Sequence, residues 1–354
     1  MRKGSFEPLT GLQPCLLPFR PHSLNAYNFY AFPLGILEAT GGVPKAWLYS
    51  NFIQLCWDSH HNAPVPFCHF LYDFSDVPAL DRRQYSWQDA RWFADPLDFV
   101  VHAVREGWYI FCTVDEFYLP GRSGAGTQHR LHDALIHGVS PDGALVAGYD
   151  VTRKLVSTWF TWFQIKSAIE EACTPEGESR PLLLFRRNHR RPYDFDTNHL
   201  RTELRDYIEG NNTSIRYRLE MNPWNRTYGL QTYSNLAQHL ERVAQNNWPL
   251  DFRHFKILHE HHDLMLQRAR WIITVYNHET QQPILHDLEV LAVQAEQLLL
   301  RVLWANARHS KQSMMEIRSD ILTMQNKDRN VAESLHRSLG KLAGADVSTN
   351  HRDD

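Results

Sequence analysis

The chain has 354 residues, of which 43% are hydrophobic and 22% are charged, and its formal net charge is −3. This length suits two domains, and the near-neutral charge excludes a general surface for nucleic acid. No apolar stretch approaches the roughly 18 residues that a membrane-spanning helix needs. The start, MRKGSFEP, does not resemble a signal peptide, and the scattered cysteines without CxxC spacing argue against disulfides or a zinc ribbon. We therefore expect a cytoplasmic protein that binds neither nucleic acid nor membranes.

The first part of the chain predicts a mixture of helices and strands. Apolar positions at helical spacing predict a helix over residues 27–39, with Pro33 either in its first turn or at a kink. A second helix is predicted over residues 45–57, and a third over residues 96–106. Residues 108–114 then predict a buried strand, because they are rich in β-branched and aromatic side chains.

A β-hairpin is predicted next. Residues 132–139 and 144–149 have the pattern of two strands joined by a tight turn, SPDG. This hairpin places His132 at the start of one strand and Asp150 at the end of the other, so we expect the imidazole and the carboxylate to lie side by side. A carboxylate at one ring nitrogen raises the basicity of the other, which is the orienting half of a nucleophilic triad. The alternative is a structural hydrogen bond at a strand end.

The second part of the chain predicts helices. After a helix over 164–172 and a strand over 181–186, long segments over 230–246, 252–277 and 283–324 show helical periodicity. Such segments pack as an antiparallel bundle, which also offers surface for a homodimer. We therefore predict an α+β domain with an antiparallel sheet followed by an all-helical bundle. The predicted boundaries are 1–190 for the first domain, 191–340 for the second and 341–354 for a flexible tail.

Two charged patterns each permit two interpretations. The basic run RRNHRR at 186–191 could contact an acidic partner protein, or it could be a solvated connection between domains. The run HEHHD at 259–263 has the start of a zinc-protease motif, but position 263 is aspartate where the second histidine would be needed. We interpret it as the polar face of a helix and predict no metal site.

Short motifs resemble the family of butirosin biosynthesis protein H, N-terminal domain. They are WLYSNFIQL at 47–55, DEFYLP at 115–120 and HDALIHG at 132–138, with DFR at 251–253 and HEH at 259–261. The resemblance implies a papain-like fold, similar to that of the double-glycine peptidases, in nonribosomal-peptide and polyketide biosynthesis. It also implies transfer of an acyl or peptidyl group from a carrier-protein thioester to an amine acceptor. The phosphopantetheine would belong to the carrier protein, so no further cofactor is expected.

The chain departs from the family's pattern at the nucleophile. The cysteine that opens the first helix of that fold aligns with Ala26. A thioester is already activated, so an amine needs only deprotonation, positioning and stabilisation of the oxyanion. We expect His132 to act as the base and Asp150 as its orienter. Asn25, Gln54 or a backbone amide at the helix N-terminus would stabilise the oxyanion.

The end of the buried strand supplies further candidates for substrate binding. Asp115, Glu116 and Tyr118 close that strand beside a glycine-containing loop, where clefts often form. They would contact the amine, or they would only be solvated groups at a strand end. The sequence thus predicts an amide-forming or chain-releasing acyltransferase. Its alternatives are an inactive scaffold that binds a carrier protein and, less supported because of Ala26, a cysteine-dependent hydrolase.

Overall fold

The computed structural model describes residues 12–60, 65–93, 95–173, 182–190, 192–246, 248, 250–276, 282–308 and 311–342. The chain divides into two compact units. Unit 1 comprises Met1–Val43 and Asp73–Pro192, and unit 2 comprises Pro44–Tyr72 and Tyr193–Asp354. None of the helices in the described ranges is both long and apolar enough to cross a membrane.

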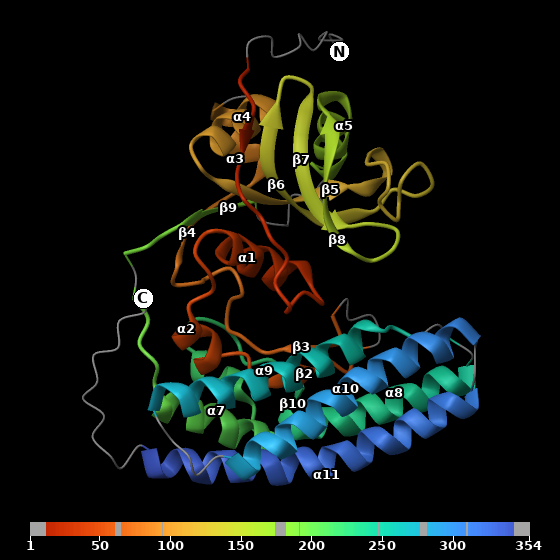
Figure 1. Ribbon diagram of the computed structural model, residues 1–354. Helices are drawn as coiled ribbons and strands as arrows, with labels where there is room; N and C mark the ends of the chain where they lie inside the picture. Colours follow the sequence, from red (N-terminus) through yellow and green to blue (C-terminus); the bar gives the residue numbers. More distant parts are fainter. Residues whose placement is uncertain are drawn as a thin grey trace. The chain divides into compact units, whose positions relative to one another are not determined.

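Unit 1 is built on an antiparallel sheet with the strand order β4-β9-β5-β6-β7-β8, and β1 also pairs with β6 (Figure 1). The strands are β1 (Cys15–Leu16), β4 (Leu80–Tyr85), β5 (Tyr109–Asp115), β6 (Leu131–Ser140), β7 (Gly143–Tyr149), β8 (Leu155–Thr161) and β9 (Leu182–Arg187). The predicted antiparallel sheet and the β6–β7 hairpin are confirmed. Strands β4 and β8 were not predicted.

Helices cover both faces of this sheet (Figure 1). They are α1 (Asn28–Ala39), α3 (Trp87–Phe93), α4 (Pro96–Arg105) and α5 (Trp162–Ala172). Alternate residues of β5 point to opposite faces, so Ile110 and Cys112 join a core with α4 and α5. Phe111 instead meets Phe32 of α1, with ring centroids 5.4 Å apart. Helix α1 starts early enough that Pro33 lies inside it and not in its first turn.

Unit 2 consists of helices and one small sheet. Its helices are α2 (Lys45–Ser50), α7 (Thr197–Glu209), α8 (Thr232–Asn246), α9 (Arg253–Tyr276), α10 (Gln282–Arg308) and α11 (Lys311–Leu342). The sheet has the order β10-β2-β3, from β10 (Thr227–Tyr228), β2 (Leu55–Trp57) and β3 (Phe67–His69). The predicted helical C-terminal half is confirmed, but unit 2 is not all-helical. The single predicted segment 283–324 is two helices, α10 and α11.

The predicted first domain, 1–190, was wrong over Pro44–Tyr72, which groups with unit 2. The helix predicted over 45–57 ends at Ser50, because Asn51 is extended and Phe52 has a φ of 54°. The chain then forms β2, which pairs antiparallel with β10, a strand from the later part of the sequence. Pairing between two strands that lie far apart in the sequence therefore groups Pro44–Tyr72 with unit 2. Of the predicted tail, 341–342 belong to α11 and 343–354 lie outside the described residues.

One buried arginine attaches this segment to the helices of unit 2. Arg268 on α9 is 0% exposed. Its Nε donates to the Tyr49 carbonyl at 2.7 Å, and its Nη2 donates to the Asn51 carbonyl at 2.6 Å. These carbonyls belong to the C-terminal end of α2, where helix carbonyls lack partners and a positive charge is favourable. Burial lowers the pKa of Arg268 to about 9, and the guanidinium still stays charged at neutral pH.

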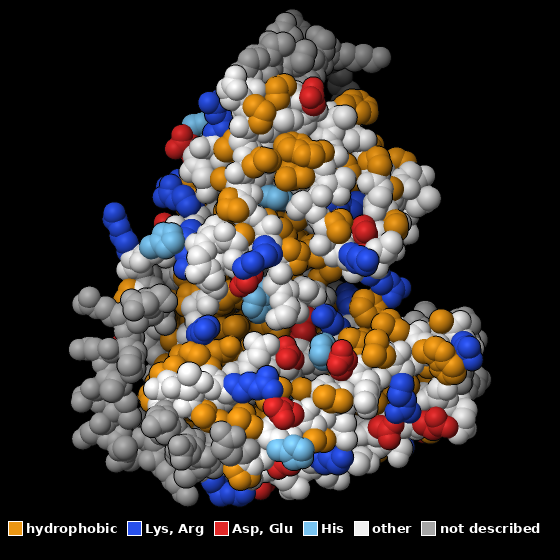
Figure 2. Space-filling model, in the orientation of Figure 1, with side chains coloured by type: hydrophobic (Ala, Val, Ile, Leu, Met, Phe, Trp, Pro, Cys, Tyr) orange, Lys and Arg blue, Asp and Glu red, His pale blue; other side chains and the backbone are white. Residues whose placement is uncertain are grey.

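Helix α10 leaves an apolar face uncovered. Val293, Leu300 and Trp304 are 51%, 59% and 51% exposed, and their spacing places them along one side of the helix. Figure 2 shows hydrophobic side chains exposed over the helical part of the molecule. Such a face is compatible with the homodimer predicted from the sequence, which stays a prediction.

Replacing Arg268 tests its role at the end of α2. Arg268→Met would leave the Tyr49 and Asn51 carbonyls buried without a donor, so we expect the free energy of unfolding to fall by about 2–4 kcal/mol. Arg270→Met is the matched control on the same helix, because the side chain of Arg270 forms an exposed ion pair with Glu289. The control should change stability by less than about 1 kcal/mol. Urea denaturation measures both, and equal effects would contradict the proposed role.

Candidate functional site

The end of β5 and the start of β6 place several ionisable side chains together. The two strands pair antiparallel, with Val114 opposite His132 and Asp115 opposite Leu131. The chain leaves β5 through a short 3-10 turn, Glu116–Tyr118, and returns to β6 past His129. Asp115 thereby meets His129, and Glu116 meets His132.

The first of these pairs is Asp115 with His129. Asp115 is 0% exposed, and its Oδ2 lies 2.6 Å from His129 Nδ1. Its other oxygen, Oδ1, accepts hydrogen bonds from the backbone amides of Phe117 and Arg130 at 3.0 and 2.9 Å. The imidazole of His129 is exposed and stacks on the ring of Phe117, with centroids 4.3 Å apart. The ring is thus held in one orientation at the surface.

The hydrogen bonds shift the pKa values of this pair in opposite directions. Burial pushes the pKa of Asp115 upward, but the hydrogen bonds from His129, Phe117 and Arg130 outweigh it and hold the pKa below its usual range. The hydrogen bond to Asp115 raises the pKa of His129 above its ordinary value. The pair therefore consists of an ionised carboxylate and an unusually basic imidazole.

A second imidazole–carboxylate pair lies beside the first one in sequence. Glu116 is 4% exposed, and its Oε1 lies 3.2 Å from Nδ1 of the part-buried His132. Burial raises the pKa of Glu116, but the hydrogen bond from His132 and the charges of His132, Arg130 and Arg122 lower it below the usual value. His132 therefore has a carboxylate at one ring nitrogen, as predicted, but the partner is Glu116.

The predicted His132–Asp150 pair was wrong. The β6–β7 ladder runs only from Ser140↔Gly143 to Leu135↔Ala147, so the hairpin is not paired as far as His132. The carboxylate of Asp150 accepts hydrogen bonds from Thr152 Oγ1 at 2.7 Å and from the Lys154 amide at 3.0 Å. Asp150 thus stabilises the turn between β7 and β8. Its pKa is lowered chiefly by the bond from Thr152.

The start of α1 lies against the same strands. Asn28 Nδ2 donates to the Asp133 carbonyl of β6 at 3.1 Å, and the Tyr149 hydroxyl donates to the Asn25 carbonyl. Ala26, the position aligned with the missing cysteine, lies between these two anchored residues and is 7% exposed. The side chain of Asn25 donates to the His22 carbonyl at 2.7 Å. Its amide is therefore engaged in a local turn and is poorly placed to stabilise an oxyanion.

Gln54 belongs to unit 2, is 0% exposed, and donates to Thr213 Oγ1 at 2.8 Å and to the Asn211 carbonyl at 3.2 Å. Its amide nitrogen is thus buried and already donates to protein atoms, so the oxyanion role of Gln54 stays a prediction without structural support. Tyr118, in contrast, does lie at the site, with its ring centroid 5.9 Å from that of His129.

One cavity of unit 1 lies away from these histidines. It measures about 330 Å³ and lies beside the edge of the sheet, among Asp81, Arg83, Trp108 and Arg186. None of the predicted site residues lines it. Arg186 stacks on Trp108 at 4.3 Å, and Arg187 Nη1 donates to the Gly42 carbonyl at 3.3 Å. The start of the basic run is therefore part of the folded unit and not a free linker.

The site can perform proton transfer. Each imidazole has a carboxylate at Nδ1, which leaves Nε2 to accept or donate a proton. Asp115, His129 and the exposed Glu171 also lie close enough to share a cation, with ligand atoms within 4.8 Å of one another. Both oxygens of Asp115 already accept hydrogen bonds, however, which favours the acid–base interpretation. His129 has no distinctive sequence pattern around it, and only the return of the chain to β6 reveals it.

The raised pKa of His129 is open to direct measurement. We expect NMR titration to give His129 a pKa above about 6.5, the ordinary histidine value. Asp115→Asn should return it toward that value, because the neutral amide no longer favours the charged imidazolium. Asp150→Asn is the control and should leave the His129 pKa unchanged. A His129 pKa that is the same in wild type and Asp115→Asn would contradict the pairing.

Comparison with known proteins adds no family assignment. No protein-family model matches the chain, and no curated protein matches it. The resemblance to the butirosin biosynthesis protein H family therefore depends on the short motifs quoted above.

Proposed function

We propose that unit 1 transfers an acyl or peptidyl group from a carrier-protein thioester to an amine, without a covalent cysteine intermediate. The observation that supports this most is the 3.2 Å contact between His132 Nδ1 and Glu116 Oε1. An imidazole with one nitrogen held by a carboxylate is an effective general base. The proposal keeps His132 as the base and replaces Asp150 by Glu116 as its orienter.

The reaction needs only one proton acceptor and one oxyanion site. His132 Nε2 would remove a proton from the amine as its nitrogen attacks the thioester carbonyl. The C–N bond forms, the C–S bond breaks, and the proton passes to the departing phosphopantetheine thiolate. The amides in the first turn of α1, which begins at Asn28, would stabilise the oxyanion, because the N-terminal end of a helix carries a partial positive charge.

The position of α1 supports a papain-like arrangement. In that fold the nucleophile at the start of a helix faces a histidine on a strand, as implied by the family resemblance. Here, the bonds from Asn28 to Asp133 and from Tyr149 to Asn25 anchor the start of α1 to the strands of the hairpin that includes His132. We propose on this basis that the chain belongs to the butirosin biosynthesis protein H family.

A non-catalytic function is the second candidate. Ala26 offers no nucleophile at the position where the family's fold implies one. Unit 1 would then be a scaffold that binds a carrier protein or its acyl group. The two candidates differ in one property, because only the enzyme converts the thioester.

A loaded-carrier assay distinguishes the two. Acyl-loaded carrier protein is incubated with a panel of amines, and mass spectrometry follows loss of the acyl group and formation of the amide. We expect His132→Ala to lower the rate by roughly 10²–10⁴-fold, the usual contribution of a general base. Glu116→Gln should lower it by about 10-fold or more, because the ring loses its orienting charge.

Matched variants define the outcomes. Asp150→Asn should keep the wild-type rate, since the carboxylate of Asp150 accepts its hydrogen bonds from Thr152 and Lys154 of its own turn. A rate abolished by His129→Ala but kept in His132→Ala would assign the base to His129. Binding of the loaded carrier without any turnover would favour the scaffold, and equal rates in wild type and both histidine variants would reject acid–base catalysis here.

The papain-like arrangement is testable without knowing the substrate. Ala26→Cys would introduce a thiol near His132, and a neighbouring imidazole lowers the pKa of a thiol. We expect Cys at position 26 to react with iodoacetamide near neutral pH faster than the native Cys15 and Cys173, measured by peptide mass spectrometry. Adding His132→Ala should remove that advantage. A rate that does not depend on His132 would contradict the arrangement.

A further inference from the structure

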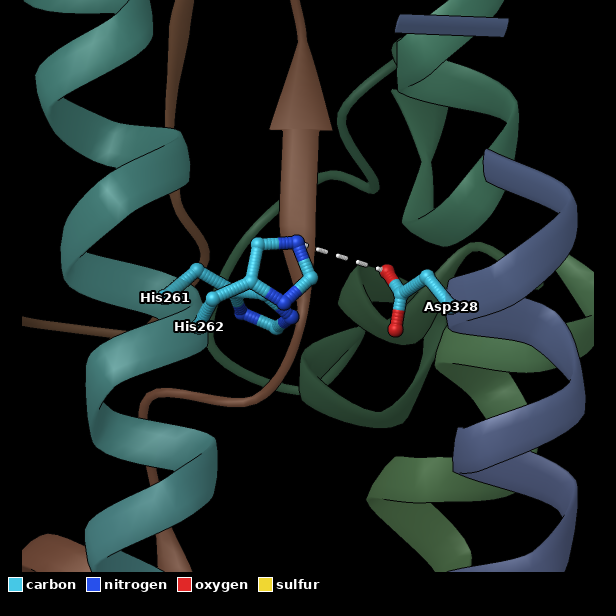
Figure 3. Close-up of side chains that lie close together, drawn as sticks. All are labelled: His261, His262 and Asp328. Carbon is cyan, nitrogen blue, oxygen red and sulfur yellow. Dashed lines mark ion pairs between the residues drawn. The ribbon is translucent and has the colours of Figure 1, made fainter. Parts of the chain in front are cut away.

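A group of polar side chains is buried where helices of unit 2 meet. His261 and His262 project from α9 toward Asp328 on α11 (Figure 3). The three residues are 0%, 0% and 2% exposed. Their ligand-type atoms, one from each residue, lie within 4.8 Å of one another. These residues lie outside the proposed acyl-transfer site, which is in unit 1.

The hydrogen bonds of this group are incomplete. Neither ring nitrogen of His261 has a hydrogen-bond partner within the described part of the chain, and His262 Nδ1 also has none. Only His262 Nε2 is bonded, to the Tyr233 hydroxyl at 2.7 Å. Buried polar atoms are nearly always satisfied in folded proteins, and exceptions often mark an ion or water that completes the site. The three unsatisfied nitrogens therefore point to a bound species.

The carboxylate of the group lacks a cationic partner of the usual kind. Asp328 Oδ2 accepts hydrogen bonds from the Tyr207 and Tyr233 hydroxyls at 2.5 and 2.7 Å, and lies 3.8 Å from His262 Nε2. No lysine or arginine among the described residues forms an ion pair with it. A buried carboxylate without a cationic partner is costly, so a bound cation would stabilise Asp328.

We propose that His261, His262 and Asp328 bind one divalent first-row transition-metal ion. Two imidazoles and one carboxylate are a donor set suited to Zn²⁺, Fe²⁺ or Co²⁺. The ion would satisfy a nitrogen of each imidazole and supply the charge that Asp328 lacks. The hydroxyls of Tyr207 and Tyr233 would orient the carboxylate from outside the ligand set. Each metal–nitrogen distance would be about 2.0–2.1 Å for zinc, reached by small rotations of the side chains.

The burial of the site indicates what the ion does. All three ligand side chains are buried, which fits a structural ion that links two elements, here α9 and α11. The ion would enter during folding and hold the helices together. The HEHHD run is not the predicted polar face of a helix, because Glu260, His261 and His262 are buried. The proposed ligands are its two adjacent histidines and the distant Asp328.

Metal content of the tag-free full chain tests the proposal. The protein is refolded with Zn²⁺, desalted and measured by inductively coupled plasma mass spectrometry. We expect about one zinc per chain in the wild type, with a Tm higher than that of the EDTA-treated protein. His261→Ala should weaken zinc binding by roughly 100-fold or more. Loss of a metal ligand should lower the affinity at least as much as loss of a residue that hydrogen-bonds to a ligand. His259→Ala, on the same helix but outside the cluster, should keep both the zinc and the Tm difference.

A second measurement does not depend on the folding of any variant. The Co²⁺ form of the wild-type chain should show the visible d–d absorption of a four- or five-coordinate site with nitrogen and oxygen ligands. Zinc retained equally by wild type and His261→Ala would mean an adventitious surface ion and would overturn the proposal. A wild-type chain that retains neither Zn²⁺ nor Co²⁺ would show that the cluster is only a Tyr–Asp–His hydrogen-bond network.

Discussion

The buried carboxylate of Asp115 is the constraint on which the candidate site depends. An ionised carboxylate without access to water is costly unless hydrogen bonds replace the lost hydration. Asp115 obtains them from the Phe117 and Arg130 amides and from His129. These bonds shape the exit of the chain from β5 and its return to β6. The same turn places Glu116 beside His132. Both imidazole–carboxylate pairs therefore depend on the hydrogen bonds that stabilise the buried Asp115.

The position of the pairs explains why this strand end is suited to acid–base chemistry. Orienting carboxylates lie at the end of one strand, and the imidazoles lie at the start of its antiparallel neighbour. His132 is on the sheet and His129 lies just before β6, and each ring has a carboxylate at Nδ1, which leaves Nε2 for proton transfer. The start of α1 is tied to the neighbouring hairpin through Asn28 and Tyr149. His132 and the start of α1 are thereby held on one structural frame.

Unit 2 also buries charged side chains, and their hydrogen bonding differs between two places. Arg268 is fully buried, and backbone carbonyls at the end of α2 accept its hydrogen bonds. Asp328 is also buried and accepts from two tyrosine hydroxyls, but the imidazoles beside it keep unsatisfied nitrogens. The first arrangement is complete with protein atoms alone. The second is incomplete, which is the physical basis for placing a metal ion there.

Elements with a local sequence signal could be predicted before the fold was known. The hydrophobic run of β5, the SPDG turn of the β6–β7 hairpin and the periodicity of the long helices predicted structures that are present, because each depends on neighbouring residues only. Tertiary structure decided which groups meet. Glu116 replaced Asp150 as the partner of His132 because Asp150 already bonds its own turn, and Pro44–Tyr72 joined unit 2 through pairing with β10. Asp328 reaches His261 and His262 only because α11 packs in the same unit as α9, a contact between residues too far apart for any spacing rule to detect.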